Sequence, residues 1–192
     1  MKLNPLHVKI AGLLEGRLFR IPEYQRAYSW TTRQRKDLFG DIEEAFRSGR
    51  EHFMATLVAL AKEKETRLIG VDEFKTVELV DGQQRVTTLI ILMKAIEKAL
   101  DNDDAAQAKV RRELGELLVK GDDHSLILLQ TNHDASQVFT NYIRKGLVEE
   151  GSAKTAADQN LVEAARDCEL FVSKWLARGA TIFELLVTIR NK

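Results

Sequence analysis

The chain has little cysteine, no long apolar run and no excess of charge of either sign. Cys168 is its single cysteine, so neither an internal disulfide nor a multi-cysteine metal site can form, and a reducing cytoplasm is the expected compartment. The most apolar run, residues 86–93, is interrupted by threonines and is far too short to span a bilayer. No export signal is visible at the N-terminus. The sequence therefore predicts a protein with no membrane segment.

The net charge and the composition further limit the kind of protein that this chain can be. The 29 basic side chains balance 29 acidic ones, so the whole chain has no general attraction to polyanions. The first 50 residues carry 10 basic and 6 acidic side chains, which is where a polyanion-binding surface would lie. With 44% hydrophobic and 30% charged residues, the 192-residue chain has the composition of a folded protein of one large or two small domains.

Apolar spacing predicts an α+β fold, with a mixed sheet and several helices. The expected helices are 6–14, 31–49, 86–100, 105–120, 136–145, 161–178 and 181–190, and the expected strands are 18–21, 53–61, 76–80 and 126–129. Residues 149–160 are poor in large apolar groups and are expected to form a flexible loop or linker. We divide the chain into an α+β domain, 1–100, and a mostly helical extension, 101–192, which is expected to be truncated because its last helix reaches Lys192 without a C-cap residue.

A candidate anion site lies at residues 80–85, between an expected strand and an expected helix. Such a junction presents unpaired N–H groups and the positive end of the helix dipole, which favour a phosphate. Gly82 allows close approach of the backbone, Arg85 adds a planar cation, and Asp81 could hold a metal ion or orient a water. The pattern is equally compatible with a structural role, in which Asp81 caps the helix and Arg85 lies on the surface.

A second candidate is the loop at residues 22–30, which interleaves aromatic and cationic side chains, together with three basic residues in the helix that follows. Such a segment could stack on a base and neutralise phosphates. As a bare pattern it favours a structural reading, in which Tyr28 and Trp30 anchor the loop to the core.

The histidines and the cysteine are weaker candidates. His52 is isolated in the sequence, and His124 and His133 lack the spacing of helical metal ligands, so structural roles are favoured for all three. Cys168 falls on the apolar stripe of its expected helix and is interpreted as a core residue.

Taken together, these N-terminal segments resemble a known family. The run Ile-Pro-x-Tyr-Gln-Arg-x-Tyr-Ser-Trp at 21–30, a helix containing Asp41, His52 opening a strand, and Val-Asp-Gly-Gln-Gln-Arg-x-Thr-Thr-Leu at 80–89 are similar to the N-terminal domain of the GmrSD type IV restriction family. The nucleases of that family attack modified phage DNA, and phosphorothioate-sensing defence proteins belong to the same group. The motifs occupy residues 19–92.

The resemblance implies a fold related to ParB and sulfiredoxin and a nucleoside triphosphatase that depends on the Asp-Gly-Gln-Gln-Arg motif. Mg²⁺ is the cofactor expected with the nucleotide, because it offsets the charge of the phosphates. It also implies a C-terminal HNH-type nuclease domain or subunit, which nothing in this chain resembles. Carried over by position, Asp81, Gln83, Gln84 and Arg85 would bind or hydrolyse nucleotide, and Tyr24, Gln25 and Arg26 would line the same cleft. Together with the residue patterns described above, this gives four sets of candidates. The catalytic candidates are Asp81, Gln83, Gln84 and Arg85; the nucleotide-binding candidates are Gly82, Arg85, Thr87, Thr88, Gln25 and Arg26; the DNA-binding candidates are Tyr24, Arg26, Tyr28, Trp30, Arg33, Arg35 and Lys36; and Asp81 is the candidate metal ligand.

Two functions remain open on the sequence. In the first, the chain hydrolyses GTP or ATP and couples this to sensing of modified DNA. In the second, it is a non-catalytic module that reads modified DNA, and the Asp81 to Arg85 motif is structural or only binds nucleotide. The sequence leaves open a homodimer, the preferred nucleotide and the DNA modification.

Overall fold

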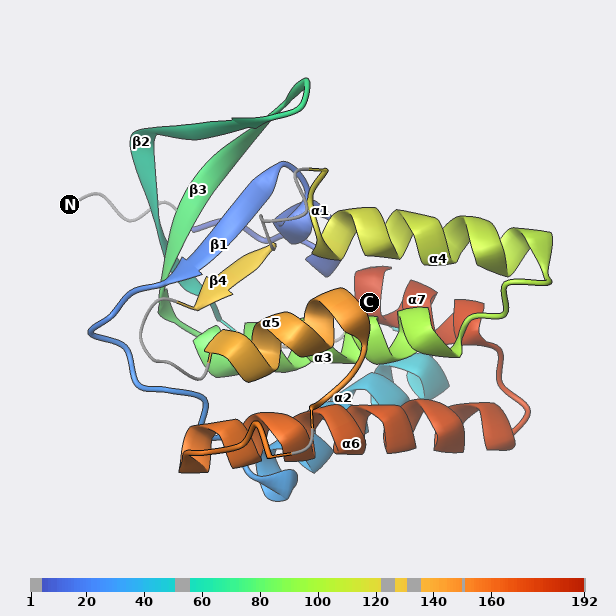
Figure 1. Ribbon diagram of the computed structural model, residues 1–192. Coiled ribbons are helices and arrows are strands. Elements are labelled where there is room, and N and C mark those ends of the chain that lie inside the picture. The colour runs from blue at the N-terminus through green and yellow to red at the C-terminus, as the bar shows by residue number, and fades with distance from the viewer. Residues whose placement is uncertain (1–4, 51–55, 122–126, 131–135, 150, 192) are drawn as a thin grey trace.

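The computed structural model describes residues 5–50, 56–121, 127–130, 136–149 and 151–191. Within these ranges the chain forms seven helices and four strands, which confirms the predicted α+β class (Figure 1). The elements are α1 (Ile10–Leu14), β1 (Arg17–Ile21), α2 (Thr32–Ser48), β2 (Val58–Ile69), β3 (Asp72–Asp81), α3 (Gln83–Ala99), α4 (Ala105–Leu118), β4 (Leu128–Gln130), α5 (Ser136–Lys145), α6 (Ala156–Ala177) and α7 (Ile182–Asn191). In the described residues no helix has the length and apolar character needed to cross a membrane.

The sheet is mixed, with the strand order β2-β3-β1-β4. β2 and β3 form an antiparallel hairpin that turns at Gly70, whereas β1 runs parallel to both of its neighbours. Phe19 of β1 pairs with Val77 of β3 and with Leu128 of β4. Because β1 and β3 are parallel, their carboxyl ends lie at the same end of the sheet. The segments that hold the two candidate motifs follow directly from these two strand ends.

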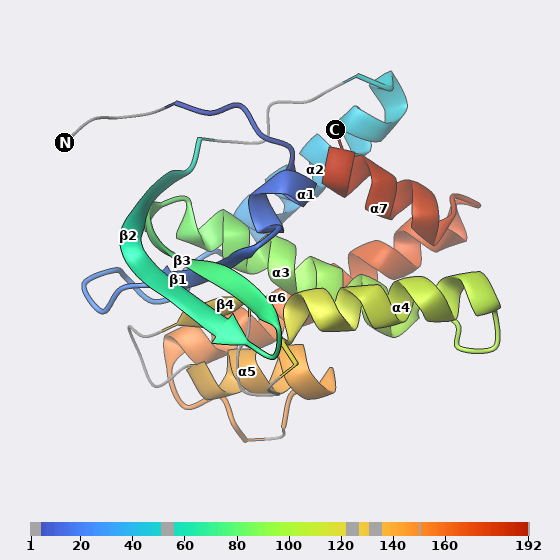
Figure 2. The same cartoon turned by 90° about the horizontal axis from the view of Figure 1, so that it is seen from above.

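Helix α3 is the centre of the molecule. Of the residues from Gln83 to Ile96, only Arg85 is not buried, as expected for a helix surrounded by protein on every side. It packs on α6, α4 and α5, and Figure 2 shows it running from the sheet into the middle of the helices. The prediction of a deeply buried helix after the Asp-Gly turn is confirmed.

The two predicted parts of the chain share one sheet and one core. β4 belongs to the second part and pairs with β1 of the first. The ring of Phe39 in α2 stacks on that of Phe171 in α6, with centroids 4.4 Å apart. The boundary at residue 100 stays a prediction about which segments fold independently.

Several elements extend beyond the ranges that the sequence predicted, and β2 and α6 do so by the most residues at a single end. β2 continues from the predicted end at Ala61 to Ile69, where it pairs with β3 at the edge of the sheet, since a charged sequence does not prevent an edge strand from forming. α6 begins at Ala156, inside the predicted linker, since Thr155 and Asp158 form a capping box in which aspartate replaces the usual glutamate or glutamine. The predictions for His52, His124 and His133 lie outside the described residues.

Candidate functional site

The Asp81 to Arg85 motif lies where the sequence predicted it, at a strand-to-helix junction. β3 ends at Asp81, and α3 begins at Gln83 after a left-handed Gly82 with φ of +86°. The left-handed backbone angle favours glycine here, and a Cβ at this position would lie 2.7 Å from Cδ1 of Leu57, so the Leu57 side chain would also have to shift. The Oδ1 of Asp81 accepts a hydrogen bond from the Gly82 N–H at 2.8 Å, which fixes the turn.

The aromatic loop at residues 22–30 lies directly against this junction. The Gln25 side chain donates from Nε2 to the Val80 carbonyl at 2.9 Å, and its Oε1 accepts from Nε2 of Gln83 at 3.0 Å. Gln84 joins the same loop further along, since its Oε1 accepts from the Ser29 N–H at 2.8 Å and its Nε2 donates to the Ala27 carbonyl at 3.1 Å. The two segments therefore form one site, as the sequence predicted from topology.

These contacts give the two motif glutamines a positioning role. Gln83 and Gln84 are each only 6% exposed, and both polar atoms of the Gln84 amide already have backbone partners. In this geometry Gln84 holds the loop in place, and its side chain is directed into the protein.

The predicted role of the two threonines in phosphate binding is wrong for this structure. Thr87 and Thr88 are 1% and 0% exposed, and their hydroxyls donate to the Gln83 and Gln84 carbonyls one turn earlier. Buried hydroxyls bonded to their own helix cannot reach a ligand outside it.

Two residues predicted to contact DNA lie inside the protein instead. Tyr28 is 4% exposed, and its hydroxyl lies 2.8 Å from Oγ1 of Thr88. The Thr88 hydroxyl uses its single proton on the Gln84 carbonyl, so Tyr28 is the donor of this bond. Burial raises the pKa of Tyr28 to about 12. The structural reading of Tyr28 as an anchor of the loop is therefore correct.

Arg35 is the second correction, because its side chain is fully buried. The guanidinium donates from Nε to Asp167 Oδ2 at 2.7 Å and from one NH group to the Trp30 carbonyl at 2.6 Å. Burial acts to lower the pKa of Arg35, but the hydrogen bond and ion pair with Asp167 outweigh it and raise that pKa. A guanidinium enclosed in this way has no face left for a DNA phosphate.

The remaining candidates do face outward. Arg85 is half-buried, and its guanidinium carbon lies 5.7 Å from the centre of the half-buried Trp30 ring, in cation–π geometry. Asp81, which precedes Gly82 in the sequence, is also exposed. The exposed DNA-binding candidates are Tyr24, Arg26, Arg33 and Lys36. At the junction itself the site thus presents the Asp81 carboxylate, the Arg85 guanidinium and the first turn of a helix, with exposed basic side chains nearby.

The donor set at Asp81 suits Mg²⁺ better than a metal held by protein alone. Among the described residues there is no group of three histidine, cysteine or acidic side chains that could enclose a metal ion. Mg²⁺ is commonly bound by one or two carboxylates together with substrate phosphates. An exposed carboxylate beside a candidate phosphate site would fit that pattern.

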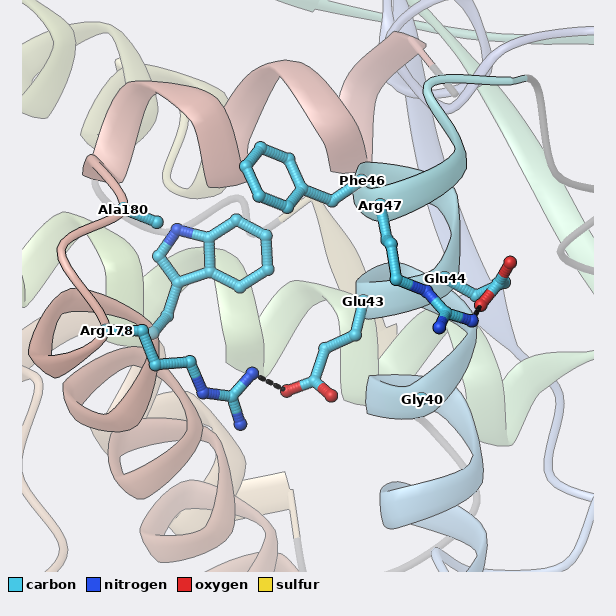
Figure 3. Close-up of a pocket in the computed structure, with 8 residues that line it drawn as sticks. Gly40, Glu43, Glu44, Phe46, Arg47, Arg178 and Ala180 are labelled. Carbon is cyan, nitrogen blue, oxygen red and sulfur yellow. Dashed lines mark hydrogen bonds and ion pairs between the residues drawn. The ribbon is translucent and has the colours of Figure 1, made fainter.

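Two cavities in the described part of the chain lie away from this junction. One of about 430 Å³ lies between α2 and the turn from α6 to α7, where Phe46 contacts Trp175 and the Glu43–Arg178 ion pair closes one side (Figure 3). The other, of about 610 Å³, runs along α4.

Helix α6 supplies residues to the site that sequence reasoning missed. Asp167 binds Arg35, and Asn160 donates from Nδ2 to the Tyr28 carbonyl at 3.4 Å. Each lies about 130 positions from its partner, so no local pattern could reveal the contact. One feature of the sequence could have pointed to Asp167: it immediately precedes Cys168 of the apolar stripe, so its charge lies beside the core and needs a partner.

A scan against protein families matches residues 10–185 to the family described as GmrSD restriction endonuclease, N-terminal domain. No curated protein matches the chain. The match covers most of the chain, including both motifs and every residue of the site described above. The chain belongs to the family of GmrSD restriction endonuclease N-terminal domains and is therefore part of a phage-defence restriction protein.

Proposed function

We propose that the junction of β3 and α3 binds the phosphates of a nucleoside triphosphate and hydrolyses it, in a module that senses modified DNA. The observation that carries this proposal is the orientation of Arg85. Its motif neighbours Gln83 and Gln84 turn inward, whereas Arg85 lies partly exposed at the first turn of a helix. A guanidinium beside unpaired helix N–H groups is a strong site for phosphate.

Each group has a distinct part in this proposal. The N–H groups of the first turn of α3 and the Arg85 guanidinium would bind phosphate oxygens and stabilise the charge that develops on them. Asp81 would hold Mg²⁺ or orient the attacking water, and the ion supplies charge neutralisation between phosphates when it is bound. Gln83 and Gln84 would act indirectly, by keeping the aromatic loop against the junction.

Modified DNA would meet the exposed part of the neighbouring segment. Tyr24 is 69% exposed, and Arg26, Arg33 and Lys36 are exposed around it. Cationic side chains contact the backbone phosphates, and an exposed aromatic ring can pack against a base or an apolar modified group. DNA cleavage would come from a separate nuclease domain or subunit.

The test is phosphate release from GTP and from ATP with Mg²⁺, with and without modified DNA. Replacement of Arg85 by Ala should lower turnover by roughly 10- to 100-fold, because a charge-assisted phosphate contact contributes about 1.5–3 kcal/mol. Arg112→Ala is the matched control, since Arg112 is an exposed arginine on α4, far from the junction. Unchanged turnover in Arg85→Ala would remove Arg85 from the mechanism.

The non-catalytic alternative also has an observation in its favour. Gln83 and Gln84 bond to the loop, and Thr88 bonds to Tyr28 of the loop, which is what a structural motif requires. That alternative predicts that wild-type protein binds modified DNA with no phosphate release from either nucleotide. Nucleotide binding by equilibrium dialysis would then separate a binding site from a purely structural turn.

A further inference from the structure

One face of α6 touches the candidate site at several points. Asn160 bonds the Tyr28 carbonyl, Asp167 bonds Arg35, and the Cys168 thiol lies 4.0 Å from the Thr88 carbonyl. Asn160 and Asp167 are seven positions apart, which places them on the same side of the helix, and Cys168 lies about 100° further round, toward the core. This side of α6 therefore lies behind the aromatic loop and the start of α3.

A continuous set of contacts leads from Asp167 to Arg85. The Asp167 carboxylate binds the Nε of Arg35, and Arg35 in turn binds the Trp30 carbonyl at 2.6 Å. The Trp30 ring then lies against the Arg85 guanidinium, 5.7 Å from centroid to carbon. Thr32 strengthens the first link, because its hydroxyl donates to Asp167 at 3.1 Å.

We propose that Asp167 is a positioning residue for the site: acting through Arg35, it holds Trp30 where its ring orients Arg85. The inference rests on the proposed function, because it assumes that the orientation of Arg85 matters for phosphate chemistry. It assigns the helical part of the chain a direct role in that site.

Asp167 is better placed for this role than the other acidic partner of Arg35. Its side chain is 25% exposed and lies 2.7 Å from the guanidinium, whereas that of Glu163 is 54% exposed and lies 3.3 Å away. Because Arg35 is fully buried, it needs a close counter-charge to keep one geometry, and a solvated carboxylate supplies less of it. Glu163 is therefore the matched control.

The first experiment follows the two indole N–H signals in ¹H–¹⁵N spectra of the full chain, with no nucleotide present. Asp167→Asn should shift or broaden the Trp30 signal, because the ring moves relative to Arg85. The Trp175 signal should stay in place, since that indole bonds the Thr181 carbonyl at the far end of α6. Glu163→Gln should leave both signals unchanged.

The second experiment measures phosphate release. Asp167→Asn should lower kcat roughly 10- to 100-fold with little change in KM, as expected for a misplaced catalytic group. In an Arg85→Ala background the same replacement should have almost no further effect, because the contacts end at Arg85. If the losses in kcat from the two replacements add up in the double variant, Asp167 does not act through Arg85 and the proposal is overturned.

A third variant covers the case in which Asp167→Asn does not fold. Asp167→Glu keeps the charge and displaces the carboxylate by one methylene, so it should fold and still shift the Trp30 signal. A folded variant in which neither the Trp30 signal nor kcat changes would overturn the proposal. If the wild type releases no phosphate at all, the proposed function fails, and the indole signals still decide whether Asp167 positions Trp30.

Discussion

The replacement of Gln84 by Met distinguishes a positioning role from a catalytic one. The two side chains have similar length and helix propensity, so the change removes the amide and little else. It leaves the Ser29 N–H and the Ala27 carbonyl without their partner. Ser29 is exposed and can bond water, whereas Ala27 is half-buried, so the expected loss is about 1–2 kcal/mol of the free energy of unfolding.

For a chain of this size, that loss lowers the melting temperature by roughly 2–8 °C. Thermal unfolding followed by circular dichroism measures it, and Gln159→Met is the control, since Gln159 is an exposed glutamine on α6. The loop should also become more accessible to protease in Gln84→Met than in the control. An unchanged melting temperature together with abolished phosphate release would refute the reasoning, because the Gln84 amide would then act on substrate and not on the loop.

Three further predictions concern the turn, the buried tyrosine and the basic surface. Gly82→Ala should destabilise the fold by about 1–3 kcal/mol in urea unfolding, because of the positive φ and the 2.7 Å contact with Leu57. Gly115→Ala, in the last turn of α4 with nothing within 4 Å of the added methyl group, should instead stabilise the fold by about 0.5–1 kcal/mol, and equal effects of the two replacements would contradict the turn geometry. The raised pKa of Tyr28, about 12, means that its contribution to stability is complete below pH 10 and is lost as the pH rises through 12. Between pH 10 and pH 12 the free energy of unfolding should therefore fall less in Tyr28→Phe than in the wild type. Parallel plots of this free energy against pH for the two proteins would contradict the raised pKa of Tyr28. If DNA binds the exposed side of the loop and of α2, the double replacement of Arg33 and Lys36 by Ala should lower the log–log salt slope of binding by up to about two, whereas Lys109 and Arg112 replaced together should not change it.

Local patterns predicted most of the fold. The capping boxes at Thr31 and Thr181 are present, because side chains three residues apart decide a helix start without help from the rest of the chain. The junction at Asp81 is also local, since a strand, a left-handed glycine and a helix follow one another directly. Where the deciding residues are neighbours in sequence, the sequence is sufficient.

The direction in which each site residue faces was not predictable in the same way. The sequence gives no reason to distinguish Arg35 from its basic neighbours Arg33 and Lys36. Of these three side chains only that of Arg35 is buried, because it forms an ion pair with Asp167. From the sequence, Thr88 is a candidate phosphate ligand, but in the structure its hydroxyl is bonded to that of Tyr28. These outcomes depend on partners 60 to 132 positions away, and the packing of α6 and α3 decides them.

The pairing of β1 with β4 has a consequence for how this protein is made. Phe19 and Leu128 are paired although they lie about 110 residues apart in the sequence. At synthesis rates of 5–20 residues per second, one edge of β1 stays open on the ribosome for roughly 5–20 s before its partner emerges. An open apolar strand edge invites pairing with another chain, and the β2–β3 hairpin covers only the opposite edge of β1, so we expect the open edge to be protected only once β4 has paired with it. A chain that ends at residue 100 would keep that edge open permanently, and it should aggregate where the full chain does not.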